Sequence, residues 1–568
     1  MTNPQSFELD TTSSGIGPKG EVAHQSLIDH TARLERRFWP VADGVWCLVG
    51  NGLSNQAFVE GPDGIIAIDT GECREEMAAA IAELRNVTDR PIVAVIYTHF
   101  HYTNGTAAIL EDSPGPLPVW GHQGIEGNLA RMGTEVGPTA RRGLIEQFGI
   151  ELPTDGSDGL LNVGLGLAYR FPDHAPFTPG FLPPDHLISE PMTATIAGLE
   201  VEFQPTPSDA DDNVTVWFPS KQVCVNNIVW PALFNVFPIR GEEYRDPRVL
   251  LDGVDHIVRL EPEHLVCAHG PPISGRDRIH SETVRYRDSI QFLWDQAVRG
   301  INQGLSSAEI AARIRLPDEY EASYFTQMHY GLAEHHVRQI QAGLRGWFDG
   351  DPANLFPLPP AERAQRLVAG FGGAENVRSA CDRAIGEDDL RWAIELATWL
   401  VRLDDAPAAD RSRLALALRT IGQRTTSANV RNWTLTRARE LEGSLDLSRH
   451  RQHTFGVRAA LALRPADLIA ALRVRVDPDV AAGRDAHLAF DVAGHGVTGL
   501  HLRRSVAVPT DGADAGVVVA LDRTTLAELV AERISLTDAE SVGRASVTGD
   551  RSALATVAAA VGLEAMRS

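Results

Sequence analysis

The chain has 568 residues, of which 43% are apolar and 22% are charged, and its formal net charge at pH 7 is −23. Because domains hold roughly 100–200 residues, this length exceeds one hydrophobic core and predicts three or four domains. The composition is ordinary for soluble globular protein and excludes a disordered or fibrous chain. The acidic balance repels phosphate backbones and anionic headgroups, so nucleic acid is excluded as a partner.

The N-terminal residues and the cysteines indicate a reducing compartment. Residues 1–30 contain no apolar run of the ~7–15 residues that a secretory signal requires. No segment approaches the ~18 consecutive apolar residues that cross a bilayer. The five cysteines are scattered without a CxxC pair, and their odd number fits reduced thiols better than a disulfide framework. We therefore expect a cytoplasmic protein with no membrane span.

The first large region alternates short apolar runs with turn residues, as in an α/β domain. Its early runs are GVWCLVG, QAFVE and IIAID, and after a helical stretch comes PIVAVIYTH. The pattern resumes with TATIAGLEVEFQPTP, TVWFP and QVCVNNIVW, and it ends with HLVCAHG. These runs predict two β-rich halves that flank helices. Between the halves lies a Gly- and Pro-rich loop, about residues 156–184, which could form one wall of a site.

The second region is helical, and the third mixes strands with helices. From residue 281 the apolar residues take helical spacing, as in SIQFLWDQAVRGI and LRWAIELATWLVRL, and Ser307 before Glu309 predicts an N-cap. Beyond residue 446, alternation returns in DAHLAFDVAG, GLHLRRSVAV and GVVVALD. The predicted divisions are an N-terminal extension over 1–30, an α/β domain over 31–280, an all-α domain over 281–445 and an α+β domain over 446–568.

Two closely spaced histidines form the first candidate site. The segment VIYTHFHYTNGT, residues 95–106, places His99 and His101 two positions apart directly after a buried strand. Imidazoles at this spacing can face one metal ion. Neutral imidazole binds zinc, iron, manganese or nickel, so the pair predicts a site without identifying its metal. An isolated HxH is as often a pair of structural loop histidines, and here the flanking residues decide.

The segment YTHFHYTNG resembles the THxHxDHxGG loop of metallo-β-lactamase-fold hydrolases, and the longer chain resembles the alkylsulfatase branch of that superfamily. The family's landmarks appear in order as RRGLIEQFGIELP, TATIAGLEVEFQPTP, NVFPIRGEEYRDP and CAHGPPISG. Its dimerisation domain is resembled by HYGLAEHHVRQIQAGLRGWFDGDPANLFPLPP, and its sterol-carrier-like module by LDRTTLAELV and SVTGD. The resemblance covers nearly all of the chain after residue 30. It implies a multidomain homodimer with an α/β metallo-β-lactamase-like αββα sandwich, an all-α dimerisation domain and an α+β sterol-carrier-like (SCP2-like) domain.

The resemblance also implies a set of metal ligands, carried over residue by residue. The implied ligands are His99, His101, Asp209 and His269. The family's first glutamate ligand falls within TPSDADDN, and Asp209 is the preferred match. Asp211 and Asp212 are alternatives if the loop is shorter.

Three other ligand positions of the family carry neutral residues in this chain. The family's Asp and third His fall on Thr103 and Asn104, and its bridging glutamate falls on Asn227. Two divalent cations a few ångströms apart repel strongly unless anionic ligands screen them. The retained ligands therefore predict one divalent metal ion, with zinc preferred, iron or manganese as alternatives, and open positions for water or substrate. A metal-free protein on the same fold is the alternative interpretation.

Two more residues are candidates for catalysis. Arg240, in IRGEEYRD, matches the arginine of the family's LRG element and could hold an oxyanion with its planar guanidinium, although such an arginine is as often an ion-pair partner. Asp69, at the end of IIAID, could orient a ligand histidine or cap the strand. Tyr330, His335 and His336 lie in the helical signature and could approach the site, with packing as the preferred interpretation.

We therefore expect a metal-dependent hydrolase related to alkylsulfatases. Its small-molecule substrate is expected to be anionic or amphiphilic and to differ from simple alkyl sulfates, because three ligand positions are altered. Two histidines and one carboxylate also hold iron in mononuclear non-haem oxygenases, so oxidative chemistry is an alternative. A third hypothesis is a metal-free dimeric protein that binds an amphiphilic ligand through its C-terminal domain.

Overall fold

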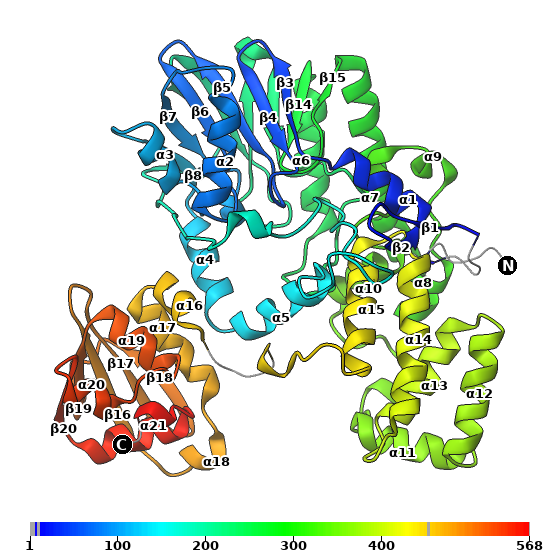
Figure 1. Cartoon of the computed structure of the whole chain (residues 1–568), viewed down its shortest axis with the longest axis vertical. Coiled ribbons are helices and arrows are strands. Elements are labelled where there is room, and N and C mark those ends of the chain that lie inside the picture. Colours follow the sequence, from blue (N-terminus) through cyan, green and yellow to red (C-terminus); the bar gives the residue numbers. More distant parts are fainter. Residues whose placement is uncertain (1–5, 8–11, 451–454, 567–568) are drawn as a thin grey trace. The chain divides into compact units, whose positions relative to one another are not determined.

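The computed structural model describes residues 6, 7, 12–450 and 455–566, which fold into two compact units (Figure 1). One unit comprises the residues up to Ile125 together with Gly143–Asp446. The other comprises Glu126–Arg142 together with Leu447–Ser568. The first unit holds an α/β domain and a helical domain, and the second is built around a small α+β domain.

The first half of the α/β domain is a seven-stranded sheet in which the strands follow chain order. Its strands are β3 (Arg37–Ala42), β4 (Val45–Val49), β5 (Gln56–Gly61), β6 (Gly64–Ile68), β7 (Ile92–Ile96), β8 (Val119–His122) and β9 (His186–Ile188). Neighbours are antiparallel from β3 to β6 and parallel from β6 to β9. The parallel section requires crossovers, which is why helices appear here and nowhere earlier in the sheet.

The second half is a six-stranded sheet, also in chain order. Its strands are β10 (Met192–Ile196), β11 (Leu199–Pro205), β12 (Val214–Phe218), β13 (Val223–Asn226), β14 (His264–Cys267) and β15 (Ile273–Ser274). All neighbours are antiparallel except β13 and β14, which run parallel. The crossover between that pair is α6 (Pro247–Leu260), whose first turn is capped by the Asp246 side chain.

The two sheets pack face to face through alternate side chains. Val45 and Cys47 of β4 share one buried cluster with Val201 and Phe203 of β11, in the two-residue period of strands. Helix α2 (Arg74–Leu84) contacts β4 and β5 of the first sheet. Helices α6 and α7 (Arg276–Asn302) share a buried core with side chains of β13 and β14 in the second sheet. The domain is thus the αββα sandwich that the resemblance predicted.

The helical domain continues from α7 within the same unit. Its further helices are α8 (Ser307–Arg313), α9 (Asp318–Glu321), α10 (Ala333–Arg345), α11 (Pro360–Gly370), α12 (Ala374–Gly386), α13 (Leu390–Val401), α14 (Ala408–Arg424) and α15 (Ala428–Leu441). The N-cap of α8 is Ser306 and not Ser307, because Ser306 and Glu309 stand at the spacing of a reciprocal capping box. The predicted domain boundaries stay predictions, and α7 crosses the one at residue 280.

The C-terminal domain surrounds a five-stranded sheet in the order β18-β17-β16-β19-β20. The strands are β16 (Ala486–Val492), β17 (Gly496–Arg503), β18 (Val506–Thr510), β19 (Val517–Leu521) and β20 (Ala545–Gly549). The helices are α16 (Val457–Ala462), α17 (Pro465–Ala471), α18 (Pro478–Ala481), α19 (Arg523–Val530), α20 (Leu536–Ser541) and α21 (Arg551–Ala560). The predicted α+β architecture is confirmed.

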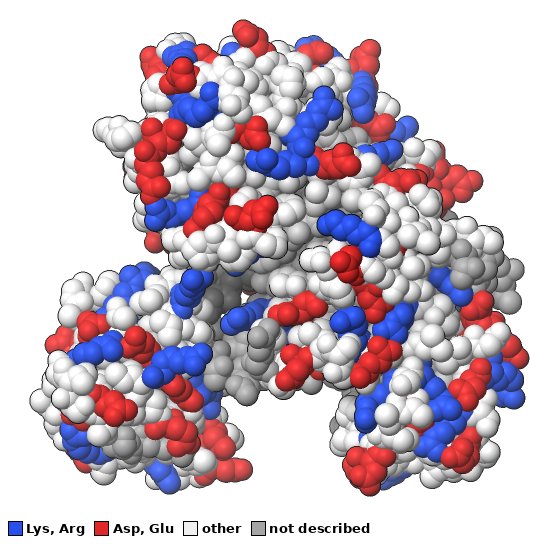
Figure 2. All heavy atoms as spheres, viewed as in Figure 1, with Lys and Arg blue, Asp and Glu red and all other residues white. Residues whose placement is uncertain are grey.

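The charges and the hydropathy of the described residues agree with the sequence analysis. Figure 2 shows acidic and basic side chains interspersed over the described atoms of the viewed face, with no continuous basic band across it. All five cysteines are free and buried. Among the described residues, no helix combines the length and apolar character needed to cross a membrane.

A buried arginine joins three segments that are distant in sequence. Arg431 of α15 donates from one amino group to the Gly159 carbonyl at 2.9 Å and from the other to the Val22 carbonyl at 3.2 Å. Val22 begins β2 (Val22–His24), which pairs with β1 (Ser14–Ile16) before α1 (Gln25–Arg33). Burial lowers the pKa of Arg431 to about 10, so this charge is kept at a desolvation cost.

We expect Arg431→Met to lower the unfolding temperature by about 3–10 °C in calorimetry, because it leaves two buried carbonyls unpaired at about 1–3 kcal/mol each. The matched control is Arg366→Met on α11, because the Arg366 side chain is 66% exposed and pairs with Glu362 one turn earlier. The control variant should change the unfolding temperature by less than about 1 °C. Equal unfolding temperatures for the two variants would contradict the proposal that Arg431 holds the three segments together.

Candidate metal centre

The loop that follows β7 is held against the end of β6 by backbone bonds. The amide of Thr70 donates to the Tyr102 carbonyl at 2.7 Å, and the amide of Asn104 donates to the Gly71 carbonyl at 3.0 Å. Gly105 is required because a Cβ there would lie 1.9 Å from the Thr70 carbonyl oxygen. The loop therefore turns back directly after the strand and presents His99 and His101 on one side.

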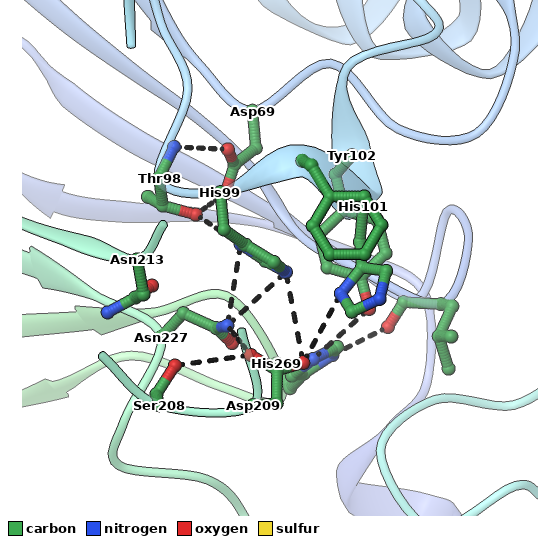
Figure 3. A network of polar contacts seen from close by, with 12 residues as sticks. Asp69, Thr98, His99, His101, Tyr102, Ser208, Asp209, Asn213, Asn227 and His269 are labelled. Atoms are coloured by element: carbon green, nitrogen blue, oxygen red, sulfur yellow. Dashed lines mark hydrogen bonds and ion pairs between the residues drawn. The ribbon is translucent and has the colours of Figure 1, made fainter. Parts of the chain in front are cut away.

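Three of the four predicted ligands meet at this point (Figure 3). One potential ligand atom from each of His99, His101 and Asp209 lies within 4.8 Å of the other two. Asp209 Oδ2 is 3.3 Å from His101 Nδ1 and 3.9 Å from His99 Nε2. Of the alternatives in the TPSDADDN loop, Asp209 is therefore the residue that joins the histidines, and neither Asp211 nor Asp212 belongs to the group.

Asp69 acts on His99 through an intermediate hydroxyl. Its carboxylate accepts from the Thr98 amide at 2.8 Å and from the Thr98 hydroxyl at 2.7 Å. Since that hydroxyl donates to Asp69, it accepts from His99 Nδ1, which lies 2.9 Å away. This assigns the proton of His99 to Nδ1 and leaves the Nε2 lone pair facing Asp209. Asp69 is therefore connected to His99 through the Thr98 hydroxyl, and its orienting role stays a prediction.

Asn227 presents an amide N–H to the cluster. Trp230 Nε1 donates to Asn227 Oδ1 at 3.1 Å, which fixes which end of the amide is oxygen. The Nδ2 end therefore faces Asp209 Oδ1 at 2.7 Å and His99 Nε2 at 3.3 Å. The Ser208 hydroxyl also donates to Asp209 Oδ1, at 3.1 Å. Both bonds leave Asp209 Oδ2 as the oxygen directed toward the histidines.

His269 lies beside the three ligands but outside their group. Its Nδ1 is 3.0 Å from the Leu53 carbonyl, which can only accept, so Nδ1 carries the proton. Its Nε2 then accepts from the Tyr102 hydroxyl at 3.3 Å. Both ring nitrogens are therefore engaged. His269 lies outside the group that His99, His101 and Asp209 form, and its role as a fourth ligand stays a prediction.

Arg240 is paired with a carboxylate that the sequence analysis did not identify. Arg240 and Arg245 both donate to the buried Glu242. Glu242 Oε1 lies 4.0 Å from His101 Nε2, which has no hydrogen-bond partner among the described residues. No motif singled out Glu242 or Arg245, since their role depends on a loop that brings IRGEEYRD against the ligands. Arg240 is accordingly both an ion-pair partner and a neighbour of the site.

Aromatic rings line the surroundings of these charges. The Arg240 guanidinium lies 5.7 Å from the ring centre of Phe148, which stacks on Tyr169 at 5.3 Å. Trp230 meets Tyr330 of the helical domain edge to face at 5.9 Å, and Gln147 donates to the Tyr330 hydroxyl at 3.1 Å. The helical domain therefore supplies one ring to this side of the α/β domain.

The two histidines of the helical signature have packing positions, in line with the preferred interpretation. His336 is fully buried, and its Nδ1 accepts from the Phe237 amide at 3.3 Å. Burial lowers the pKa of His336 to about 3 and also lowers the pKa of His335. Neither belongs to the ligand group.

The pKa shifts follow from burial and from Asp209. Burial lowers the pKa of His99 to about 3 and the pKa of His269 to about 4, so both rings are neutral. Burial also acts to lower the pKa of His101, but the hydrogen bond and charge of Asp209 outweigh it and raise that pKa. Although burial opposes it, the neighbouring histidines and Arg245 hold the pKa of Asp209 well below its usual range. The group combines two imidazoles with an ionised carboxylate.

The donor set fits one divalent metal ion. Ligands bound at about 2.0–2.1 Å in a tetrahedron stand about 3.3 Å apart, close to the separations of Asp209 Oδ2 from the two imidazoles. Beside this group, Asn227 directs an N–H at Asp209 and the Tyr102 hydroxyl donates to His269 Nε2.

Three family models match: "Metallo-beta-lactamase superfamily" over residues 49–102, "Alkyl sulfatase dimerisation" over 306–444 and "Alkyl sulfatase C-terminal" over 456–563. A linear primary-alkylsulfatase of a Pseudomonas species is 33% identical over 516 residues, covering 87% of this chain and 96% of that protein. An (R)-specific secondary-alkylsulfatase of Pseudomonas is 30% identical, covering 93% of this chain and 80% of that protein.

A solved structure shares the whole arrangement. The stereoselective inverting sec-alkylsulfatase Pisa1 from Pseudomonas superposes with a TM-score of 0.84 at 27% identity. The superposition covers 95% of this chain and 86% of that one. The similarity therefore extends through the α/β, helical and C-terminal domains.

Asp69 makes a pH-dependent contribution to stability that can be measured on metal-free protein. Burial raises its pKa to about 7 against the hydrogen bonds from Thr98, which lower it. Between about pH 4 and pH 7 the folded protein therefore binds more protons at Asp69 than the unfolded chain does. We expect the free energy of unfolding to fall by up to about 4 kcal/mol from this residue as the pH rises through that window.

The test compares the pH slopes of wild type and Asp69→Asn in denaturant unfolding with chelator present. The variant should lose stability at every pH, because its NH2 group cannot accept from the Thr98 hydroxyl, but the slope between pH 4 and 7 should be less negative. Asp63→Asn, on the turn between β5 and β6, is the control and should keep the wild-type slope. Parallel curves for wild type and Asp69→Asn would refute the assignment.

Proposed function

The chain belongs to the alkylsulfatase family of the metallo-β-lactamase superfamily, and we propose that it is a hydrolase that cleaves an anionic ester with a single divalent metal ion. The observation that carries the proposal is the arrangement around Asp209. One carboxylate oxygen faces two imidazole nitrogens, and the other is held by Asn227 and Ser208. We assign the metal to His99, His101 and Asp209, with zinc preferred.

The proposal gives His269 a supporting role. An imidazole that donates to Leu53 and accepts from Tyr102 holds the Tyr102 ring beside His99, whose ring centre is 5.0 Å away. The resemblance implies that the corresponding histidine of the family is a metal ligand. Here the neutral residues Thr103, Asn104 and Asn227 support a count of one ion per chain.

The charges near the site favour an anionic substrate. Arg240 and Arg245 are balanced by Glu242 and Asp209, so a bound divalent cation would leave a local excess of positive charge. We infer an ester of a sulfate-like anion with an apolar alcohol, in keeping with the alkylsulfatases to which the chain is similar. Because Thr103, Asn104 and Asn227 stand at ligand positions that the resemblance implies, we expect it to differ from simple alkyl sulfates.

The side chains would divide the work of such a hydrolysis. When bound, the ion supplies Lewis-acid polarisation of an ester oxygen and lowers the pKa of water. Asp69 and Thr98 keep the Nε2 lone pair of His99 directed at the cluster. Arg240 offers guanidinium N–H groups to the anionic head while Glu242 holds it in place. His101, whose side chain is 15% exposed, lies on the side from which substrate would approach, since His99 is fully buried.

We also propose that the chain acts as a homodimer, because the matched dimerisation model covers residues 306–444. The C-terminal domain is proposed to bind the apolar part of an amphiphilic ligand, in keeping with its resemblance to sterol carriers. Neither proposal changes the assignment of the metal ligands.

Plasma mass spectrometry on protein purified without a histidine tag tests the metal site. We expect one ion per chain in wild type and less than about 0.1 in the His99→Ala, His101→Ala double variant, because a lone carboxylate does not retain a divalent ion. The matched control is His269→Ala, which should keep the ion. Loss of the metal from that control would make His269 a ligand.

The same measurement separates the other hypotheses. Two ions per chain would refute the single-metal site. Iron in place of zinc would favour the oxygenase alternative, which oxygen uptake with candidate substrates would then examine. A metal-free wild type that still bound amphiphiles would favour the binding-protein hypothesis.

Hydrolysis of 4-nitrophenyl sulfate and of decyl sulfate, followed as sulfate release, tests the role of Arg240. We expect Arg240→Met to lower kcat/KM by about 10–100-fold, chiefly through KM, because one charge-assisted hydrogen bond is worth about 1.5–3 kcal/mol. Arg248→Met, at an exposed position on α6, is the control and should leave both constants unchanged. An unchanged KM in Arg240→Met would exclude it from substrate binding.

A further inference from the structure

Glu242 is a buried carboxylate that two arginines share. Arg240 donates to its Oε1 and Arg245 to its Oε2. The side chains of Arg240, Glu242 and Arg245 are only 8%, 10% and 3% exposed. Ion pairs in water contribute little, but charges withdrawn from water act strongly on any charge that enters beside them. We call these three residues the Arg–Glu–Arg group.

The Arg–Glu–Arg group lies against the candidate metal group. Glu242 Oε1 is 4.0 Å from His101 Nε2, and the other ring nitrogen, Nδ1, is 3.3 Å from Asp209 Oδ2. The His101 ring therefore has one carboxylate at each of its nitrogens. The charge of Glu242 thus acts at the place where the proposed function puts the anionic head of the substrate.

The two arginines of the group have different surroundings. Arg245 also donates to the Asn235 carbonyl at 2.8 Å, so its guanidinium is fixed to the backbone as well as to Glu242. Among the described residues, the hydrogen bonds of the Arg240 side chain go only to Glu242. Because a guanidinium has five N–H donors, Arg240 keeps some of them for a ligand. Arg245 holds Glu242 in place, and Glu242 occupies part of Arg240.

The proposed reaction changes the charge of the anionic head. Hydrolysis of a sulfate monoester adds one water molecule, breaks the bond between the alcohol and the sulfate, and yields the alcohol, inorganic sulfate and a proton. The ester carries one negative charge, whereas the sulfate product carries two. Since the Coulomb energy is proportional to the charge of the ligand, a strongly positive site would bind the product more tightly than the substrate. Slow release of product would then limit turnover.

We propose that Glu242 is a specificity-determining residue that limits the binding of doubly charged anions, so that the singly charged ester can compete with the sulfate product. The inference rests on the proposed function and deepens it. Glu242 offsets one of the two guanidinium charges and takes up N–H groups of Arg240 that a sulfate ion would otherwise bind. Loss of its charge strengthens the attraction for each negative charge on a ligand, so a dianion gains about twice the energy that a monoanion gains.

Titration calorimetry of the metal-loaded full chain at constant ionic strength tests this with two probes. Sodium sulfate is doubly charged, and sodium hexanesulfonate is a singly charged analogue of the ester that cannot be hydrolysed. We expect Glu242→Gln to lower the Kd of sulfate by at least about 10-fold and that of hexanesulfonate by only about 3-fold, because doubling an energy squares its effect on Kd. Damage to the fold would weaken binding and cannot produce this gain. The matched control is Glu243→Gln, at the exposed next residue, which should keep both constants.

Arg245→Met changes the charge in the opposite direction, and it keeps the inference testable if Glu242→Gln does not fold. This variant should raise the Kd of sulfate by at least about 10-fold and that of hexanesulfonate by about 3-fold. A ratio of the two Kd values that stays at the wild-type level in either folded variant would overturn the role of Glu242 and leave the proposed hydrolase intact. A wild type that binds neither anion would overturn the proposed anionic substrate as well.

Discussion

The fixed orientation of the Asn227 amide is the constraint on which the rest of the site depends. Trp230, three residues further along the chain, donates to its oxygen, so the amide cannot turn its oxygen toward the cluster without losing that bond. The N–H end then holds one oxygen of Asp209 and leaves the other facing His99 and His101. A carboxylate at this position would attract a second cation, whereas an N–H group repels one. The indole of Trp230 and the carboxylate of Asp209 together set which end of the amide faces the candidate ligands.

The side chains around Asn227 come together because most of them follow the carboxyl ends of strands. Asp69, Thr98, Asn227 and His269 each follow within two residues of the carboxyl end of a strand, and the strands concerned form the two parallel pairs β6–β7 and β13–β14. Parallel neighbours end at the same edge of a sheet, so each pair delivers two side chains to one place. Asp209 comes from the connection between β11 and β12. The helical domain closes the arrangement with Tyr330.

The sequence could predict the fold and three residues of the candidate metal group because both follow from local patterns and their order. Apolar alternation gives the strands, and a resemblance spread over the whole chain gives their arrangement. The engagement of His269 by Tyr102 could not be predicted, since it depends on where a hydroxyl lies after two distant loops have folded. Glu242 and Arg245 were missed for the same reason. Their importance comes from mutual burial beside His101 and from no spacing that the sequence displays.

The proposed single-ion site has the same net charge as the two-ion site that the resemblance implies for the family. Relative to the ligands that the resemblance implies for the family, an aspartate and a glutamate are replaced here by Thr103 and Asn227, which raises the local charge by two. One divalent cation fewer lowers it by two. The attraction for an anionic head group is therefore preserved when carboxylates and cation are lost together, whereas losing either alone would change it strongly. On the proposed single-ion assignment, the neutral residues Thr103 and Asn227 therefore leave the net charge beside the substrate unchanged.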